Sequence, residues 1–175
     1  MVVLSQTGQA PPLAGQVISG KNEPSSEYQL HLEVYERRPD INVVFHAHPL
    51  YATAFALDGM ALDKPVLPEI IIALGQIPIA EYGTPGTPEL AHAIRGLIEM
   101  HDALLLKNHG VLTVGRNFDE AFNRMETVER CAEIMFAALL IGKPSPIPKA
   151  SLKKLSGYDK LQAQLGSLKP NATLN

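Results

Sequence analysis

The feature that most constrains the fold of this 175-residue chain is a pair of short apolar runs that each lead into histidine and then a turn-forming residue. The first run, residues 43–45, consists of strand formers and continues through His46 and His48 to Pro49, which cannot continue a β-ladder. Side chains two residues apart on a strand point to the same side. The sequence therefore predicts a strand that ends with two imidazoles side by side.

The second run, residues 103–106, leads to His109 and Gly110 in the same way. The pair His46 and His48 alone is more often structural than metal-binding, and His109 alone is a weaker signal still. Histidines at the ends of two buried strands reverse that preference, because three imidazoles with one free coordination position are a catalytic zinc arrangement. Such sites also accept cobalt or manganese, so the identity of the metal stays open.

Helical patterns separate the predicted strands. Thr87 and Pro88 are typical of a helix cap and first helical residue. Residues 119–141 form the longest helical pattern. Its predicted buried face comprises Ala121, Met125, Val128, Ala132, Met135 and Leu139. Residues 111–114 are expected to return as the hairpin partner of the 103–106 strand, so the pattern favours an α/β fold with a mixed, largely antiparallel sheet.

The stretch 24–27 is predicted to open a helix, with a serine as cap and Glu27 in the first turn. Three residues are expected on the inward stripe of this helix: Tyr28, Leu32 and Tyr35. Glu27 could be a fourth metal ligand and then a general base, although its residue type alone favours a simple role at the helix dipole. Ser25 and Ser26 are equally compatible with an anion site and with capping.

Composition narrows the function classes. The formal net charge is −3 and no basic run is present, which argues against nucleic acid as a partner. The longest apolar stretch, residues 135–142, is far shorter than the roughly 20 residues of a membrane span, and no signal peptide is evident. Cys131 is the single cysteine, so no internal disulfide is possible and a cytoplasmic location is expected.

Four other residues carry weaker signals. Tyr82 could donate a proton, but packing within a loop is the favoured interpretation from the residue alone. His31, His92 and His101 are predicted not to be ligands, because His31 lies on the first helix and the other two flank a helix expected to face solvent.

Four motifs resemble the class II aldolase/adducin family, and in particular its fuculose-phosphate aldolases. They are Pro-Ser-Ser-Glu at 24–27, His-Ala-His-Pro at 46–49, Tyr-Gly-Thr-Pro-Gly-Thr at 82–87 and Lys-Asn-His-Gly at 107–110. Their order and spacing follow the family from about residue 1 to residue 148. We therefore expect one domain over residues 1–148 and a C-terminal tail over residues 149–175.

The resemblance implies a three-layer α/β/α sandwich and aldol cleavage of a short sugar phosphate through a zinc-stabilised enediolate. It also implies a homotetramer. The implied site residues are the zinc ligands His46, His48 and His109, the catalytic residues Glu27 and Tyr82, and the phosphate-binding residues Ser25 and Ser26.

Two departures from the family pattern affect these expectations. Family members usually carry some tens of residues before the point that Met1 matches, including a Gly-Asn loop of the phosphate site. Either the start of the sequence is misassigned or truncated, or the phosphate pocket lacks part of its wall. The family's aldolases also use a tyrosine from a C-terminal tail, for which Tyr158 is the candidate here.

Other functions stay open on the same residues. A dehydratase, decarboxylase or epimerase could use the same metal site, and a non-catalytic, adducin-like assembly module could use the same fold. Epimerases of the family place an aspartate where Ile71 aligns, which disfavours epimerisation. The complete set of histidines with Glu27 argues against a pure scaffold.

Overall fold

The computed structural model of the chain describes residues 3–4 and 17–167. Its central sheet has four strands in the order β3–β6–β5–β4. Their bounds are Val43–Ala47 for β3, Gly110–Gly115 for β6, Ala103–Leu106 for β5 and Ile79–Ala80 for β4. Both β3 and β5 run antiparallel to β6, whereas β4 runs parallel to β5. The predicted mixed, largely antiparallel sheet and the predicted hairpin are confirmed.

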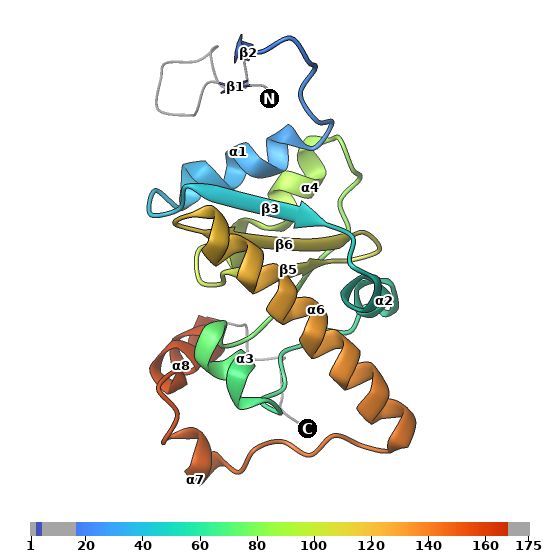
Figure 1. Cartoon of the computed structure of the whole chain (residues 1–175), viewed down its shortest axis with the longest axis vertical. Coiled ribbons are helices and arrows are strands. Elements are labelled where there is room, and N and C mark those ends of the chain that lie inside the picture. The colour runs from blue at the N-terminus through green and yellow to red at the C-terminus, as the bar shows by residue number, and fades with distance from the viewer. Residues whose placement is uncertain (1–2, 5–16, 168–175) are drawn as a thin grey trace.

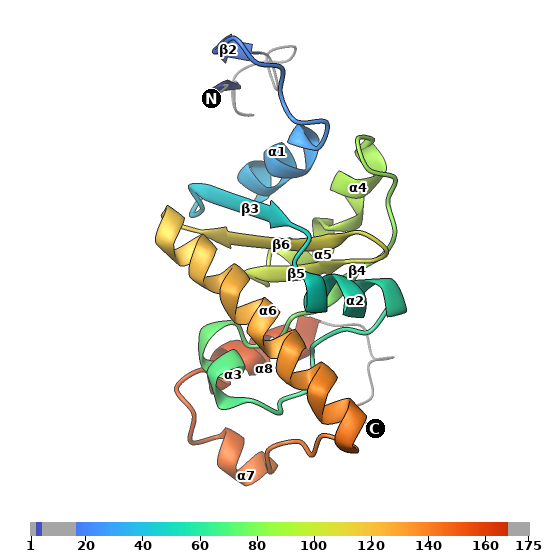
Figure 2. The ribbon, with the colours of Figure 1, turned by 45° about the vertical axis from the view of Figure 1, so that its right-hand side comes forward.

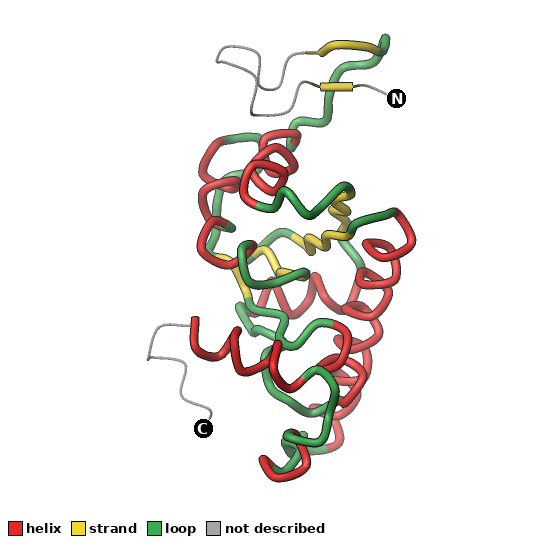
Figure 3. The backbone as a smooth tube through the Cα atoms, turned by 90° about the vertical axis from the view of Figure 1, so that its left-hand side faces the viewer, coloured by secondary structure: helices red, strands yellow, loops and turns green. Residues whose placement is uncertain are grey.

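Helices cover both faces of this sheet and make a three-layer sandwich, as predicted (Figures 1 and 2). One face is covered by α1 (Tyr28–Arg37), α4 (Pro88–Ala93) and α5 (Arg95–Ile98). The other face is covered by α2 (Leu50–Asp58) and α6 (Phe118–Ile141), with α3 (Pro68–Ala73) packed beside α6. Figure 3 shows the strands enclosed between these helices.

The strand β5 explains why residues 103–106 are uninterruptedly apolar. Leu104 and Leu106 pack with α1, α4 and α5, whereas Ala103 and Leu105 pack with α2 and α6. A strand buried on both faces has no solvent side that would favour polar residues. Both layers of the core therefore meet on this strand.

The longest helix, α6, begins where the sequence predicts. Asn117 caps it, because its side-chain oxygen accepts a hydrogen bond of 2.8 Å from the backbone N–H of Glu120. The predicted buried face is confirmed from Ala121 to Met135, but Leu139 is 41% exposed and that part of the prediction is wrong. The last turns of α6 extend beyond the sheet (Figure 1), and Leu140 and Ile141 there are exposed. Across the described ranges, neither α6 nor any other helix is long and apolar enough to span a membrane.

The first helix differs from its prediction at its start and on its inward face. It begins at Tyr28, with Glu27 as the cap residue and no side-chain capping bond from a serine. Leu30 and Val34 are its buried apolar residues. Of the predicted stripe, Tyr35 is partly buried against the same core, whereas the prediction is wrong for Tyr28 and Leu32. A tyrosine hydroxyl needs a polar partner, and that of Tyr35 donates to the backbone oxygen of Asn42 near the surface.

Near the N-terminus, β1 (Val3–Leu4) and β2 (Val17–Ser19) pair antiparallel. This pair lies beyond α1 and apart from the four-stranded sheet (Figures 1 and 2). The sequence predicts short strands over residues 1–4 and around 16–18, joined by a Gly/Pro-rich hairpin, and β1 and β2 confirm the two strands. Met1, Val2, Gln16 and the predicted hairpin lie outside the described residues.

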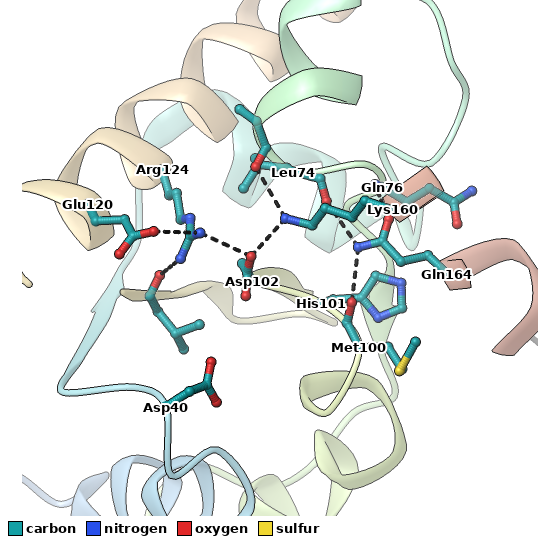
Figure 4. A network of polar contacts seen from close by, with 12 residues as sticks. Asp40, Leu74, Gln76, Met100, His101, Asp102, Glu120, Arg124, Lys160 and Gln164 are labelled. Atoms are coloured by element: carbon teal, nitrogen blue, oxygen red, sulfur yellow. Dashed lines mark hydrogen bonds and ion pairs between the residues drawn. The ribbon is translucent and has the colours of Figure 1, made fainter. Parts of the chain in front are cut away.

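The stretch expected to be a C-terminal tail contains two helices, α7 (Lys149–Leu152) and α8 (Tyr158–Ser167). Leu152 and Leu161 pack on Ile71 of α3 in a third apolar cluster. The buried side chain of Gln164 accepts from the N–H of Gln76 and donates to the backbone oxygens of Leu74 and Met100 (Figure 4). The α8 helix is thereby bonded to the loops at one end of the sheet.

Candidate metal centre

The antiparallel register of β3 and β6 determines where the first two histidines lie. His46 pairs with Leu112, and Ala47 pairs with Val111. His48, the residue directly after β3, therefore comes level with Gly110 at the start of β6. Strand alternation then directs the side chains of His46 and His48 to the same side.

The three candidate ligands gather at this end of the sheet. The ring centroid of His46 lies 4.8 Å from that of His48 and 4.9 Å from that of His109. The rings of His48 and His109 are 4.9 Å apart with an interplanar angle of 29°. One nitrogen of each ring lies within 4.8 Å of the others, so the three residues could hold one metal ion.

Gly110 allows this close approach. A β-carbon added at Gly110 would lie 2.6 Å from Cδ2 of His48 and 2.7 Å from the backbone oxygen of Ala47. Any other residue would therefore displace the His48 ring or the end of β3. The glycine after His109 is thus explained by close packing against a ligand.

His109 is presented by the tight turn between β5 and β6. Asn108 has a φ of 56°, the left-handed conformation that asparagine tolerates better than most residues. The N–H of His109 donates to the backbone oxygen of Leu106 at 3.0 Å, and that of Asn108 donates to Ala56 of α2 at 3.0 Å. These bonds hold the turn to the strand on one side and to α2 on the other.

Glu27, at the start of α1, brings a carboxylate to the three histidines from the sheet face opposite to α2 and α6. Its Oε2 lies 2.7 Å from Nε2 of His46, and its Oε1 lies 3.0 Å from Nε2 of His109. The side chain is 13% exposed. Although Glu27 lies at least 19 residues from either histidine in the sequence, the fold places its two oxygens against two of the three rings.

The hydrogen bonds of His46 leave one ring nitrogen free for a ligand role. Its Nδ1 lies 2.8 Å from the backbone oxygen of Val111, a contact that needs a proton on Nδ1 and leaves Nε2 with a lone pair. Nε2 is buried and makes no hydrogen bond of regular geometry among the described residues, although Oε2 of Glu27 lies 2.7 Å from it. A metal ion would satisfy this nitrogen, so the residues present fit such an ion.

Burial favours the neutral imidazoles that a metal requires. Burial lowers the pKa of His46, the charge of His48 lowers it further, and the contacts with Val111 and Glu27 oppose the shift only in part. Burial likewise lowers the pKa of His109 against the opposing charge of Glu27. Neutral imidazole is the form that binds metal, and the exposed His48 leaves the cluster open to solvent on its side.

The predicted phosphate residues lie in the turn before α1. Oγ of Ser25 accepts a bond of 3.3 Å from the N–H of Glu27, so this hydroxyl keeps its own proton to donate. Both Ser25 and Ser26 are exposed. A β-carbon on Gly86 would lie 3.8 Å from Cβ of Ser26, which shows that the 83–87 loop passes beside the serines.

Tyr82, by contrast, is not brought into contact with the cluster. It is 55% exposed in the loop between β4 and α4. Within the described part of the chain, it has no hydrogen bond or ring contact with Glu27 or with the three histidines. Its side chain is therefore available to solvent or to a ligand.

His31 is close enough to the site to be affected by its charges, although it was predicted not to be a ligand. Burial lowers its pKa, the charge of His46 lowers it further and that of Glu27 raises it, so these three groups act on one another. Its position on α1, one turn after Glu27, was the signal that could have indicated this. His101 was expected beside a solvent-facing helix, but it is buried and its Nδ1 lies 2.9 Å from the backbone oxygen of Leu97.

The fold is an α/β/α sandwich, and three histidines and a carboxylate meet at one end of its sheet. These features place the chain among domains with a candidate metal site. Residues 2–136 match the family model described as the Class II Aldolase and Adducin N-terminal domain. The chain therefore belongs to the class II aldolase and adducin family.

The relatives differ in the reactions that their names give. The chain is 38% identical over 152 residues to the 5-deoxy-D-ribulose 1-phosphate aldolase of Bacillus thuringiensis serovar kurstaki, covering 83% of this chain and 70% of that protein. It is 34% identical over 128 residues to the 3-oxo-tetronate 4-phosphate decarboxylase of Pectobacterium atrosepticum, covering 71% of this chain and 58% of that protein.

Solved structures agree with the fold. An L-fuculose 1-phosphate aldolase superposes with a TM-score of 0.75 at 37% identity, covering 85% of this chain and 68% of that one. The chain thus spans about two thirds of the length of the aldolases that it matches.

Proposed function

We propose that this protein catalyses metal-dependent aldol cleavage of a short ketose phosphate, together with the reverse condensation. One observation carries the proposal: the carboxylate of Glu27 lies 2.7 and 3.0 Å from two of three clustered histidines. Relatives named as aldolases of 5-deoxyribulose and fuculose phosphates support the substrate class.

In this proposal His46, His48 and His109 hold a divalent ion, which we take to be zinc. Cobalt and manganese also suit three imidazoles. When bound, the ion supplies a Lewis acid that polarises the substrate carbonyl and stabilises negative charge beside it. Neutral imidazole ligands do not cancel the ion's charge, which strengthens this effect.

Glu27 then moves the proton that the cleavage requires. As the C3–C4 bond of the ketose breaks, the C4 hydroxyl loses its proton and becomes the carbonyl of the aldehyde product. Carbon 3 receives a proton carried by Glu27, so the products are the aldehyde and dihydroxyacetone phosphate. A carboxylate held among buried groups and against the histidines is placed for this transfer.

Ser25 and Ser26 are proposed to bind the substrate phosphate. Their hydroxyls are exposed and lie in the turn that directly precedes Glu27. Tyr82 is proposed to relay the proton of the C4 oxygen: in cleavage its phenol oxygen accepts the C4 hydroxyl proton while the phenol proton passes to solvent, and in the condensation it donates a proton to the aldehyde oxygen. Its loop continues past Ser26. An exposed phenol on a loop can turn toward a bound substrate, which supports this role.

The test of this function is the Glu27→Gln variant. The variant should keep its metal, because the three histidines remain, and turnover of ketose phosphates should fall by about 10²- to 10⁴-fold. Metal content by atomic emission and aldehyde release in a coupled assay would measure the two effects. Glu36→Gln, an exposed change on the same helix, is the matched control and should keep full activity. An unchanged rate in Glu27→Gln would remove Glu27 from the reaction.

A decarboxylase is the second candidate, because one relative is named as a 3-oxo-tetronate 4-phosphate decarboxylase. The two reactions differ in their products. Supplied with fuculose, ribulose and rhamnulose phosphates, an aldolase releases an aldehyde, whereas a decarboxylase releases carbon dioxide only from a phosphorylated oxo acid. Epimerisation stays disfavoured, since Ile71 is buried in the apolar cluster of α3, α7 and α8.

A non-catalytic, adducin-like role makes the opposite prediction for metal. Purified protein that retains less than about a tenth of an equivalent of zinc, cobalt or manganese after loading and desalting would contradict the metal-site proposal. Stoichiometric metal would support an enzyme, since an assembly module has no use for three open imidazoles.

We further propose that the protein is a cytoplasmic homo-oligomer, with a tetramer as the expected state. The single cysteine supports a reducing compartment. The assembly is supported by large apolar side chains exposed on the last turns of α6 and on α2: Phe136, Leu139, Leu140, Ile141, Leu50 and Leu57. Sedimentation velocity that finds only monomers at micromolar concentration would contradict this state.

A further inference from the structure

The helix α2 has no cap of its own. Its cap residue is Pro49, which has no side-chain acceptor, and no capping bond forms within the helix. The free N–H groups of Tyr51 and Ala52 instead donate to Oε1 and Oε2 of Glu129 at 2.9 Å each. One carboxylate of α6 thus takes the place of the usual cap on another helix, nearly 80 residues away in the sequence.

This cap acts next to one candidate ligand. β3 ends at Ala47, α2 begins at Leu50, and only His48 and Pro49 lie between them. The N–H of Thr53 also donates to the backbone oxygen of Pro49 at 2.9 Å. With so short a connection, a shift of the first turn of α2 moves the backbone of His48.

The same helix also holds the turn that presents the third ligand. The backbone oxygen of Ala56, one turn further along α2, accepts from the N–H of Asn108 at 3.0 Å. Asn108 directly precedes His109. The position of α2 therefore bears on both His48 and His109, and the ribbon places α2 between these segments and the middle of α6 (Figures 1 and 2).

We propose that Glu129 is a positioning residue for the metal centre: by capping α2 it fixes the placing of His48 and of the His109 turn. This role rests on the proposed function in so far as the histidines hold a metal. The carboxylate suits the task twice over, because its two oxygens satisfy two N–H groups and its charge complements the positive end of the helix. The bonds also occupy this helix terminus, so it is not an anion site.

The first test uses the protein without metal. The amides of Tyr51 and Ala52 have no partner within α2, so Glu129 is what protects them from hydrogen exchange. In Glu129→Gln, which keeps one acceptor oxygen and loses the charge, we expect at least about tenfold faster exchange at these two amides. Equal exchange in the wild type and the variant would overturn the capping role, whatever the protein does with metal.

The second test measures the metal centre itself. Zinc affinity should fall by about 10- to 100-fold in Glu129→Gln, as is usual when a group that orients metal ligands is lost. The visible spectrum of the cobalt-loaded protein should change as well, because it reports ligand geometry. The matched control is Glu133→Gln, one turn along the same helix, whose carboxylate pairs with Arg130 at the surface. It should leave both readouts unchanged.

Rescue separates capping from a general loss of helix packing. In Glu129→Ala, the added change Pro49→Ser supplies a hydroxyl at the cap position of α2, where the backbone is already extended. The double variant should recover slow exchange at Tyr51 and Ala52 and most of the zinc affinity. Circular dichroism and thermal unfolding confirm that each variant is folded, and Glu129→Gln serves alone if the alanine variant is not.

The outcomes distinguish this inference from the proposed function. Wild type that binds metal together with a Glu129→Gln variant of equal affinity and identical cobalt spectrum would overturn the inference and leave the proposed function intact. Wild type that binds no metal would contradict the metal site, while the exchange data would still decide whether Glu129 caps α2.

Discussion

The polar side chains at the two ends of β5 differ in how they are paired. Before the strand, the buried Asp102 is surrounded by cations. Arg38 lies at 3.0 Å, and Arg124 at 3.1 Å and Lys160 at 2.8 Å are drawn in Figure 4. These partners come from α1 and its C-terminal cap, α6 and α8. After the strand, three histidines and Glu27 converge, and Nε2 of His46 lacks a hydrogen bond within the described residues. The buried carboxylate of Asp102 is thus paired with cations, whereas the histidine cluster keeps a buried nitrogen without a hydrogen bond.

This difference shows what each end contributes. A buried polar group without a partner costs about 1–3 kcal/mol, so most buried polar groups are paired. The paired carboxylate at Asp102 links three helices and serves stability. The unpaired nitrogens at the histidine cluster, by contrast, are ready for a ligand that folding alone does not supply. Changes at one end should therefore affect metal binding, and changes at the other should affect stability.

The sharpest break in this comparison is His46→Ala. Zinc affinity should fall by more than about 100-fold, because roughly 10 kcal/mol of zinc binding shared among three ligands exceeds 3 kcal/mol for each. Competition with a chromophoric chelator would measure it. The ring also bonds Val111, so the metal-free protein should lose only about 1 kcal/mol of unfolding free energy.

His92→Ala is the matched control for this change. His92 is exposed on α4 and is not one of the clustered histidines. Its removal should leave zinc affinity within twofold of the wild type. Equal losses in the two variants would mean that the cluster is not the metal site.

Asp102→Asn tests the other end of the strand. The amide removes the charge that Arg38, Arg124 and Lys160 share, and breaking a buried ion pair typically costs about 3 kcal/mol. The melting temperature of a chain of this size should then fall by roughly 6–12 °C. Zinc affinity should stay unchanged. Calorimetry and metal titration of the same preparation would measure both.

At acidic pH the wild type should lose its higher unfolding free energy relative to Asp102→Asn. Burial alone would raise the pKa of Asp102, but the hydrogen bond and charge of Lys160, with Arg124 and Arg38, hold the pKa below its usual value. A carboxyl with a depressed folded pKa stabilises the protein above its unfolded pKa of about 3.9 and loses this effect as pH falls further. The difference in unfolding free energy should thus be constant above about pH 5 and shrink toward pH 3. A difference that grew in acid would contradict the pairing.

Much of the fold could be predicted because its signals are local. The start of α6 and most of its apolar face, the cap at Thr87, and the hairpin after His109 depend on residues close together in the sequence. The convergence of β3 with the β5–β6 turn also followed, because both runs end in histidine at the same edge. Such patterns need no knowledge of tertiary packing.

The contacts that complete each end could not be predicted in the same way. Glu27 meets His46 and His109 only because α1 lies across the sheet from α2 and α6. The ion cluster of Asp102 joins groups that are 22 to 64 residues apart, and nothing in the local sequence marks them as partners. The prediction that Tyr28 and Leu32 face inward on α1 was wrong for the same reason. Packing rather than residue type decides that Leu30 and Val34 are buried.

The smallest expected effect on zinc affinity comes from a substitution beside the histidine cluster. Gly110→Ala adds one methyl group that would lie 2.6 Å from the ring of His48 and 2.7 Å from the backbone oxygen of Ala47. Because the backbone oxygen is held in the sheet, the ring of His48 must move, and zinc affinity should fall by about tenfold. Isothermal titration with zinc would measure the change.

Gly96→Ala separates this steric effect from the general effect of replacing a glycine. Gly96 lies in α5, and a β-carbon there meets nothing within 4 Å. Alanine should raise the unfolding free energy by about 0.5–1 kcal/mol, since a helical glycine loses more chain entropy on folding, and should leave zinc affinity unchanged. If Gly110→Ala behaved like Gly96→Ala, the space beside His48 would not be reserved for its ring. A loss of zinc affinity confined to Gly110→Ala would instead show that this glycine sets the position of the ligand.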